Sequence, residues 1–162
     1  MVKAIPEGYH TLTPSITMKD ARRAIDFYKK AFGAKEKEVI PGPNGKGVMH
    51  AEIQIGDSML MLGDETPESS CKSAETVGEA TAAFALYVPD VDASFKQAVA
   101  AGAIMDKPVA DMFWGDRCGS VKDPFGYSWW ILTHKKDVPP QEMAAAAKAF
   151  AEKEAAGASS KN

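Results

Sequence analysis

Hydrophobic and polar positions along the chain follow one pattern that occurs twice. In the first copy, residues 11–18 alternate between apolar and hydroxyl side chains, which predicts a half-buried strand. Apolar residues then recur at helical spacing from Ala21 to Phe32, with Asp20 as a cap before them and Gly33 as a stop after them. Three further strand patterns follow, over residues 35–40, 49–55 and 58–62.

The second copy repeats this order after a connector. Residues 84–88 predict a strand, and apolar positions between Val91 and Ala101 predict a helix that stops at Gly102. Three more strand patterns follow, over residues 104–109, 117–122 and 128–133. Because an internal repeat indicates the architecture of the whole chain, we expect an α+β fold. Its two βαβββ modules should form a curved mixed sheet around a concave cavity.

The same pattern predicts where the domain and its parts begin and end. We expect one domain over residues 1–138, with module one at about 9–63, a mobile connector at 64–81 and module two at about 82–134. An Ala-rich helix opened by Pro139 and Pro140 should follow over residues 139–157. A disordered tail is expected over residues 158–162.

Composition narrows the function classes. The chain has 162 residues and a net charge of −3, and no cluster of lysines and arginines points to nucleic acid. No apolar run approaches the roughly 20 residues that span a membrane. Two cysteines, Cys71 and Cys118, are too few for a disulfide scaffold, which favours a reduced, cytoplasmic protein. A single bridge between them is the alternative. Cys118 lacks a local activating pattern, so a buried structural thiol is favoured over a nucleophile.

Strand alternation predicts which side chains line the cavity. One face of the strands suits packing against the helices, and it carries apolar residues such as Leu12, Leu60 and Trp129. The other face mixes hydroxyl, thioether and aromatic groups, which suits a pocket for a mid-sized organic ligand. Its candidate ligand-binding residues are Thr13, Met59, Met61, Tyr87 and Trp130. Trp130 could stack on a flat or cationic ligand. The alternative is that these residues fill a core or a dimer interface.

Residues 113–117 form a loop with two aromatic side chains and a possible ion pair. As a lid, this loop would place Trp114 at the cavity mouth and offer Arg117 to an anionic ligand group. As a structural loop, it would only brace the start of the following strand through Asp116 and Arg117.

His50 and Glu52 are a histidine and a carboxylate on the same face of one strand. They are candidate catalytic residues as an acid–base pair, or half of a displaced metal site that His10 would complete. The alternative is a solvated strand face. His134, which follows the last strand, is expected at the surface.

Two motifs carry a resemblance to a known family. The first, KDxxxAIDFYxxxFGA over residues 19–34, resembles the first-helix signature of the vicinal oxygen chelate superfamily, which includes glyoxalase I, extradiol dioxygenases and bleomycin-resistance proteins. The second, WGDR at 114–117 followed by DPFGYSW at 123–129, resembles the closing signature of the PhnB-like branch. The resemblance covers residues 9 to about 135, and it implies a site on the concave face of the sheet.

The resemblance also implies a metal site in those members that use one. Their four ligands are His, Gln or Glu from the first and last strands of each module. The corresponding positions here are Thr13, Met61, Ala83 and Trp130. Hydroxyl and thioether groups bind hard cations poorly, and Ala and Trp offer no useful lone pair. We therefore expect no metal at these positions and no other cofactor, with a divalent metal elsewhere as the weaker alternative.

Three functions compete at this point. The first is a metal-free, PhnB-like protein that binds a small apolar or aromatic molecule. The second is a lyase, isomerase or oxygenase that uses a relocated metal near His50, Glu52 and His10. The third is an interaction module whose C-terminal helix docks on a second subunit. A homodimer is expected under all three, because the modules leave sheet edges and a concave face to cover.

Overall fold

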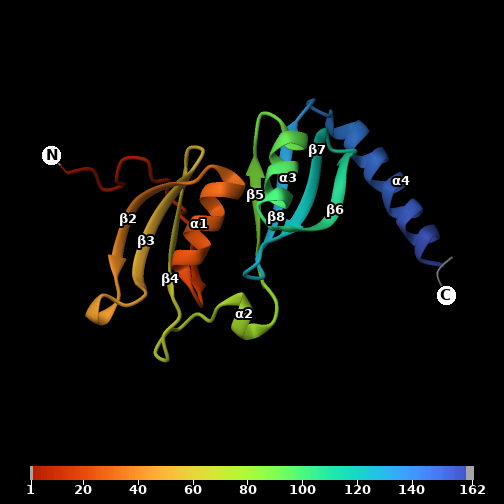
Figure 1. The fold of residues 1–162 in the computed structure, drawn as a ribbon. Helices are drawn as coiled ribbons and strands as arrows, with labels where there is room; N and C mark the ends of the chain where they lie inside the picture. Colours follow the sequence, from red (N-terminus) through yellow and green to blue (C-terminus); the bar gives the residue numbers. More distant parts are fainter. Residues whose placement is uncertain (1, 160–162) are drawn as a thin grey trace.

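Each copy of the repeat folds into one helix and one sheet of four strands in the computed structural model (Figure 1), which describes residues 2–159 and the side chains up to residue 153. The first module consists of β1 (Ser15–Met18), α1 (Ala21–Phe32), β2 (Lys35–Pro41), β3 (Val48–Ile55) and β4 (Ser58–Asp64). The strand order is β1-β4-β3-β2, with β1 parallel to β4 and the other pairs antiparallel.

The second module repeats this topology. It consists of β5 (Ala83–Tyr87), α3 (Val91–Ala100), β6 (Ile104–Asp111), β7 (Asp116–Lys122) and β8 (Ser128–His134), in the order β5-β8-β7-β6. The predicted α+β fold with two βαβββ modules is therefore confirmed. Its strands are divided between two mixed sheets, and no backbone ladder joins β1 to β5 in the part of the chain that the structure describes.

The helix caps form as the sequence predicts. The Asp20 side chain accepts a hydrogen bond from the backbone N–H of Arg23, and Gly33 ends α1 with φ +66° in the left-handed region. Asp90 caps α3 in the same way. The two helices pack against one face of the sheets and against each other (Figure 1). The core beneath them is one cluster that includes Ile25, Tyr28, Ile53, Leu62, Trp129 and Ile131.

Two segments, the start of β1 and the connector, differ from the sequence-based prediction. Strand β1 begins only at Ser15, so residues 11–14 approach the sheet as a strap outside the strand. Pro14 has no N–H for a ladder, although its carbonyl accepts a hydrogen bond from Met61 N at 3.0 Å. The connector contains a short helix, α2 (Ala74–Val77), and a further 3₁₀ turn, η1, lies at Pro43–Gly45.

The connector is held by one carboxylate. Glu65 accepts hydrogen bonds from Ser73 N at 3.0 Å and from the Thr76 hydroxyl at 2.8 Å. These hydrogen bonds, the Ser73 backbone N–H first among them, lower the pKa of Glu65 to about 2. Asp64, at the end of β4, likewise accepts from Ala21 N and Val48 N, each at 2.7 Å. Glu65 therefore braces the connector itself, and Asp64 ties the end of β4 to the start of α1 and of β3.

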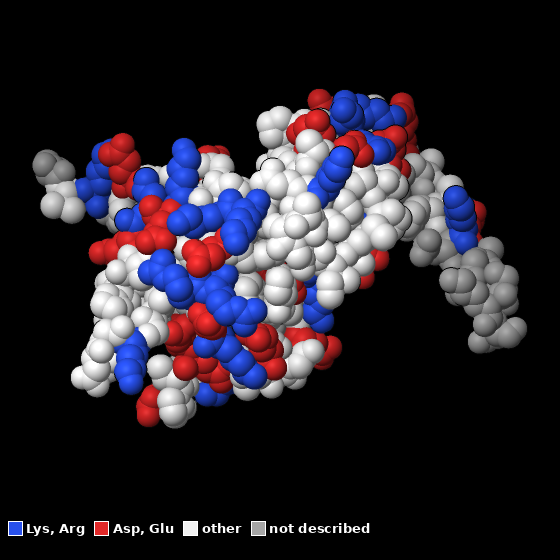
Figure 2. All heavy atoms as spheres, in the orientation of Figure 1, with Lys and Arg blue, Asp and Glu red and all other residues white. Residues whose placement is uncertain are grey.

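The C-terminal helix α4 (Pro140–Ser159) points away from the sheets (Figure 1). It runs two residues beyond the expected end at 157, so residues 158 and 159 of the tail expected at 158–162 are helical instead. The remaining residues of that tail, 160–162, lie outside the described residues. The Phe150 ring contacts Phe113 at a centroid distance of 5.2 Å. Among the helices described, none is long and apolar enough to cross a membrane. On the face seen in Figure 2, acidic and basic side chains interleave over the first module.

Candidate functional site

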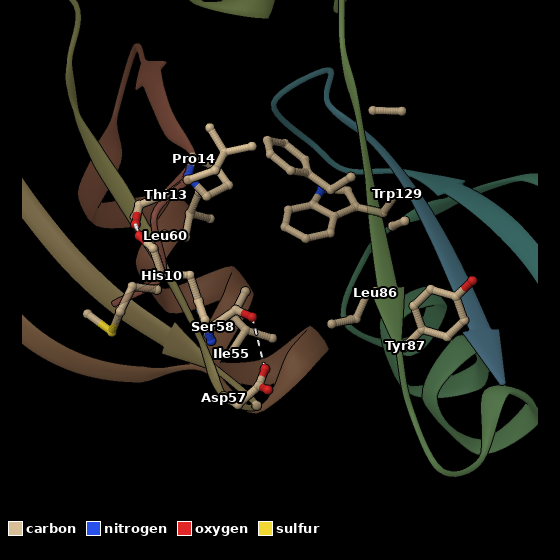
Figure 3. A pocket seen from close by; sticks show the side chains of 16 residues that line it. His10, Thr13, Pro14, Ile55, Asp57, Ser58, Leu60, Leu86, Tyr87 and Trp129 are labelled. Atoms are coloured by element: carbon tan, nitrogen blue, oxygen red, sulfur yellow. Dashed lines mark hydrogen bonds between the residues drawn. The ribbon is translucent and has the colours of Figure 1, made fainter. Parts of the chain in front are cut away.

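A pocket of about 480 Å³ lies between the two modules. Figure 3 shows Pro14 and Leu60 on its first-module side, and Trp129 and Leu86 on its second-module side. The rest of the lining comes mainly from the strap, the β3–β4 hairpin and strand β5. Most of these side chains are apolar, with a few polar groups among them, as is typical of a site for a small organic molecule.

Local sequence explains why the pocket stays open. Strands β1 and β5 are the sheet edges that face the junction, and they share no hydrogen-bond ladder. Strand β5 presents Ala83 and Ala85, whose small side chains fill little space. Leu12, which alternation placed against the helices, instead lies in the strap and lines the pocket with 85% of its surface exposed. Leu12 therefore belongs to the exposed lining of the pocket and not to the core.

The structure brings some of the predicted ligand-binding residues together and not others. Thr13, Met59 and Tyr87 line the pocket. Met61 and Trp130 lie outside its lining, on the face of each sheet opposite the helices, which we call the open face. Trp114 and Arg117 are also outside the lining. Trp114 belongs to a hydrogen-bond network around Asp116, whereas Arg117 binds Asp92.

That network centres on Asp116, which is buried at the start of β7. Its carboxylate accepts hydrogen bonds from Tyr87 Oη at 2.9 Å and from Trp114 Nε1 at 3.1 Å, and it contacts His134 Nδ1 at 2.7 Å. Burial acts to raise the pKa of Asp116, but these contacts outweigh it and the pKa is lowered. Figure 3 shows the Tyr87 hydroxyl directed away from the pocket, so Tyr87 offers the pocket its ring.

Arg117 does not pair with Asp116, in contrast to the ion pair that the sequence suggested. Its guanidinium binds Asp92 through two hydrogen bonds of 2.8 Å and Asp111 at 3.3 Å. Adjacent residues on a strand point to opposite faces, which separates Arg117 from Asp116. His134, expected at the surface, is half exposed, but it is tied to Asp116 and, through Nε2, to Asp137 at 3.1 Å. These contacts raise the pKa of His134, the Asp116 contact most strongly.

The candidate catalytic residues His50 and Glu52 do meet. His50 Nε2 lies 3.3 Å from Glu52 Oε1 on β3. Sequence reasoning missed Tyr9, whose buried hydroxyl approaches Glu52 from the N-terminal segment without a hydrogen bond of good geometry. The Tyr9 hydroxyl and then His50 lower the pKa of Glu52 against the effect of burial, while burial and Glu52 raise the pKa of Tyr9 to about 12. Tyr9 precedes every strand pattern, so no periodicity in the sequence pointed to it.

A metal site of the kind known from the resemblance does not fit the donor atoms present. Thr13, Met61, Ala83 and Trp130 supply at most a hydroxyl and a thioether. Among the described residues, no three His, Cys, Asp or Glu side chains gather as metal ligands would. His10, the proposed third member of a relocated site, instead lines the pocket, and its carbonyl accepts a hydrogen bond from the Thr13 hydroxyl at 3.2 Å.

The two cysteines are separate thiols. Cys71 is exposed and Cys118 is buried, and neither forms a disulfide. Burial raises the pKa of the Cys118 thiol, which favours a packed side chain over a nucleophile.

Comparisons with known proteins agree with this architecture. The family model of the Glyoxalase/Bleomycin resistance protein/Dioxygenase superfamily matches residues 9–131. An uncharacterized protein of Mycobacterium bovis is 39% identical over 138 residues, which are 83% of this chain and 90% of the relative. The crystal structure of TioX from Micromonospora sp. ML1 is 27% identical, with a TM-score of 0.61 over 77% of this chain and 98% of TioX.

A PhnB protein from Bacillus cereus is 15% identical, with a TM-score of 0.60 over 76% of this chain and 99% of that protein. At this identity the similarity concerns the fold alone. The mycobacterial relative and the family model extend the likeness to the sequence over most of the chain. On this evidence the chain belongs to the Glyoxalase/Bleomycin resistance protein/Dioxygenase superfamily.

Proposed function

We propose that this chain is a PhnB-like, metal-independent protein that binds a small hydrophobic or aromatic molecule between its two modules. The observation that carries the proposal is the pocket of about 480 Å³, whose lining is largely apolar. A volume of this size suits a mid-sized organic ligand. The poor donors at Thr13, Met61, Ala83 and Trp130 favour binding without a metal. The PhnB-like assignment rests on the motifs at 114–117 and 123–129.

A homodimer is part of this proposal. Leu12 is 85% exposed and Ile104 is 68% exposed, and a second copy is one way to cover them. The apolar side chains of Met143, Ala147 and Phe150 on α4 are a further surface for a partner. Light scattering of the full chain and of a chain without residues 139–162 tests this. We expect a dimer for the full chain. If the shortened chain is a monomer that still binds ligand, α4 is needed for dimerisation and not for the binding site.

A fluorescent apolar probe, N-phenyl-1-naphthylamine, tests the binding function. We expect saturable binding with a Kd in the micromolar range, which corresponds to a binding free energy of about −8 kcal/mol. EDTA should not change this affinity. Ala85→Trp should abolish binding, because the indole would fill the pocket from β5. Ala93→Trp, at an exposed position on α3, is the matched control and should bind like the wild type. If the probe does not bind the wild type, or if Ala85→Trp binds as well as Ala93→Trp, the proposal fails.

An enzymatic function is the second candidate, favoured by the contact between His50 and Glu52. In that case the chain would be a glyoxalase-like lyase, an isomerase or an oxygenase with a divalent metal at these side chains. Metal analysis of the purified wild type and of His50→Ala distinguishes the two functions. One metal per subunit, lost on His50→Ala, would support the enzyme, whereas metal-free protein that binds the probe supports the first proposal.

A further inference from the structure

Lys107 lies over the indole of Trp130 on the open face of the second sheet. Its Nζ is 5.1 Å from the centre of the ring. The strand register places Lys107 opposite Ser120, Ser120 opposite Trp130, and Trp130 opposite Ala85. Cross-strand partners share one face of a sheet, so these four residues form a row. Ala85 lines the pocket, so the row leads from the pocket to the Lys107 ammonium.

Irregular pairing in β6 positions this lysine. The register of β6 against β7 shifts on both sides of Lys107, between Met105 and Lys107 and again before Ala110. Bulges of this kind redirect side chains and often lie beside functional sites. The positive charge of Lys107 also acts on the pKa of the buried Cys118 thiol, against the larger effect of burial. The ammonium is therefore close to the open face.

The Lys107 charge has no carboxylate partner among the side chains that the structure describes. The neighbouring Asp106 accepts a hydrogen bond from the Ser120 hydroxyl at 2.7 Å and forms no ion pair with Lys107. Arg117, a second cation of this module's sheet, is already bound to Asp92 and Asp111. Lys107 is thus a cation held by an aromatic ring, next to an apolar pocket, with its charge available to a ligand.

We propose that Lys107 and Trp130 form an anion subsite beside the pocket, so that the ligand class is an aromatic molecule with an acidic group, such as an aryl carboxylate or sulfonate. The inference rests on the proposed binding function. A cationic ligand would be repelled, because the face of Trp130 already holds a cation. The aromatic part of the ligand would occupy the pocket beside Ala85, and its anionic group would pair with Lys107 across Trp130.

Two probes that differ by one sulfonate test this subsite. They are N-phenyl-1-naphthylamine, which is neutral, and 1-anilinonaphthalene-8-sulfonate, which is the same molecule with an anionic group. We expect the wild type to bind the sulfonate about tenfold more tightly, a preference of about 1.4 kcal/mol. Lys107→Met should abolish the preference and Lys107→Glu should reverse it, with the affinity for the neutral probe unchanged in both. Added salt should weaken only the binding of the sulfonate to the wild type.

Lys96→Glu, at an exposed position on α3, carries the same change in net charge and is the matched control. It should keep the preference for the sulfonate. If the wild type binds both probes equally, or if Lys107→Glu behaves like Lys96→Glu, the anion subsite is refuted while the binding function stands. If the wild type binds neither probe, the binding function itself fails, and the subsite fails with it.

Discussion

The Tyr28 hydroxyl donates a hydrogen bond of 2.8 Å to Asp123 Oδ2, across 95 residues of sequence. Tyr28 is fully buried on α1 of the first module, and Asp123 lies in the turn between β7 and β8 of the second. The same carboxylate oxygen accepts from Trp129 Nε1 at 3.0 Å, and Trp129 lines the pocket. One buried carboxylate therefore joins the modules and fixes a wall of the candidate site.

Asp123→Ala is expected to destabilise the fold strongly. Besides Tyr28 and Trp129, the Asp123 carboxylate accepts hydrogen bonds from the backbone N–H groups of Phe125 and Tyr127. Each buried donor left unpaired costs about 1–3 kcal/mol, so the free energy of unfolding should fall by at least about 3 kcal/mol. Tyr28→Phe removes one hydrogen bond and should cost about 1 kcal/mol. Urea unfolding measures both.

Asp57→Ala provides the control for that measurement, because Asp57 is exposed on the β3–β4 hairpin. This substitution should change the free energy of unfolding by no more than about 0.5 kcal/mol. An Asp123→Ala variant as stable as Asp57→Ala would mean that the carboxylate does not join the modules. The burial of Asp123, which raises its pKa more than its hydrogen bonds lower it, is consistent with a group costly to disturb.

Leu60 and Leu12 both line the pocket but differ in burial, so their truncation should separate stability from binding. Leu60 is 4% exposed, and Leu60→Ala should lower the free energy of unfolding by about 2–5 kcal/mol. Leu12 is 85% exposed, so Leu12→Ala should leave stability unchanged and weaken the binding of N-phenyl-1-naphthylamine. Urea unfolding and probe titration are the measurements. Unchanged probe affinity in Leu12→Ala would show that the strap does not contact the ligand.

The repeat allowed most of the fold to be predicted from sequence, because each element has a local signal. Asp20 and Gly33 bound α1, and alternation identified seven of the strands to within a few residues. The start of β1 could not be read this way. The apolar and hydroxyl side chains of residues 11–14 alternate as in a strand, but this segment lies at the junction of the modules without a ladder.

The site was less predictable, because its contacts join distant segments. Strand alternation identified Thr13, Met59 and Tyr87 as candidate ligand-binding residues, and all three line the pocket. It gave no sign that Tyr87 bonds to Asp116, 29 residues away. Charge pairs are equally non-local: Arg117 follows Asp116 in sequence but binds Asp92 from α3. Periodicity indicates which face of a strand a residue occupies, but it does not indicate which side chain from another element contacts that residue.

The contact between His134 and Asp116 should make stability depend on pH. The pKa of His134 is raised above its usual 6.5 by Asp116 first and Asp137 second. A raised histidine pKa contributes stability that is complete below the unfolded pKa and is lost as the pH rises through the folded one. The difference in Tm between the wild type and His134→Gln should therefore be larger at pH 6 than at pH 9. An equal difference at both values would mean that the imidazole is neutral in the contact.

Arg117→Met should leave the binding of 1-anilinonaphthalene-8-sulfonate unchanged, in contrast to Lys107→Met. The guanidinium meets both oxygens of Asp92 and also Asp111, so its charge and its donors are already engaged. An anionic ligand would have to displace a carboxylate to reach it, whereas Lys107 has no carboxylate to give up. Probe titrations of the two variants decide between the cations. If Arg117→Met weakens binding and Lys107→Met does not, the loop at residues 113–117 acts as the lid that the sequence suggested, and Arg117 is the residue that recognises the anion.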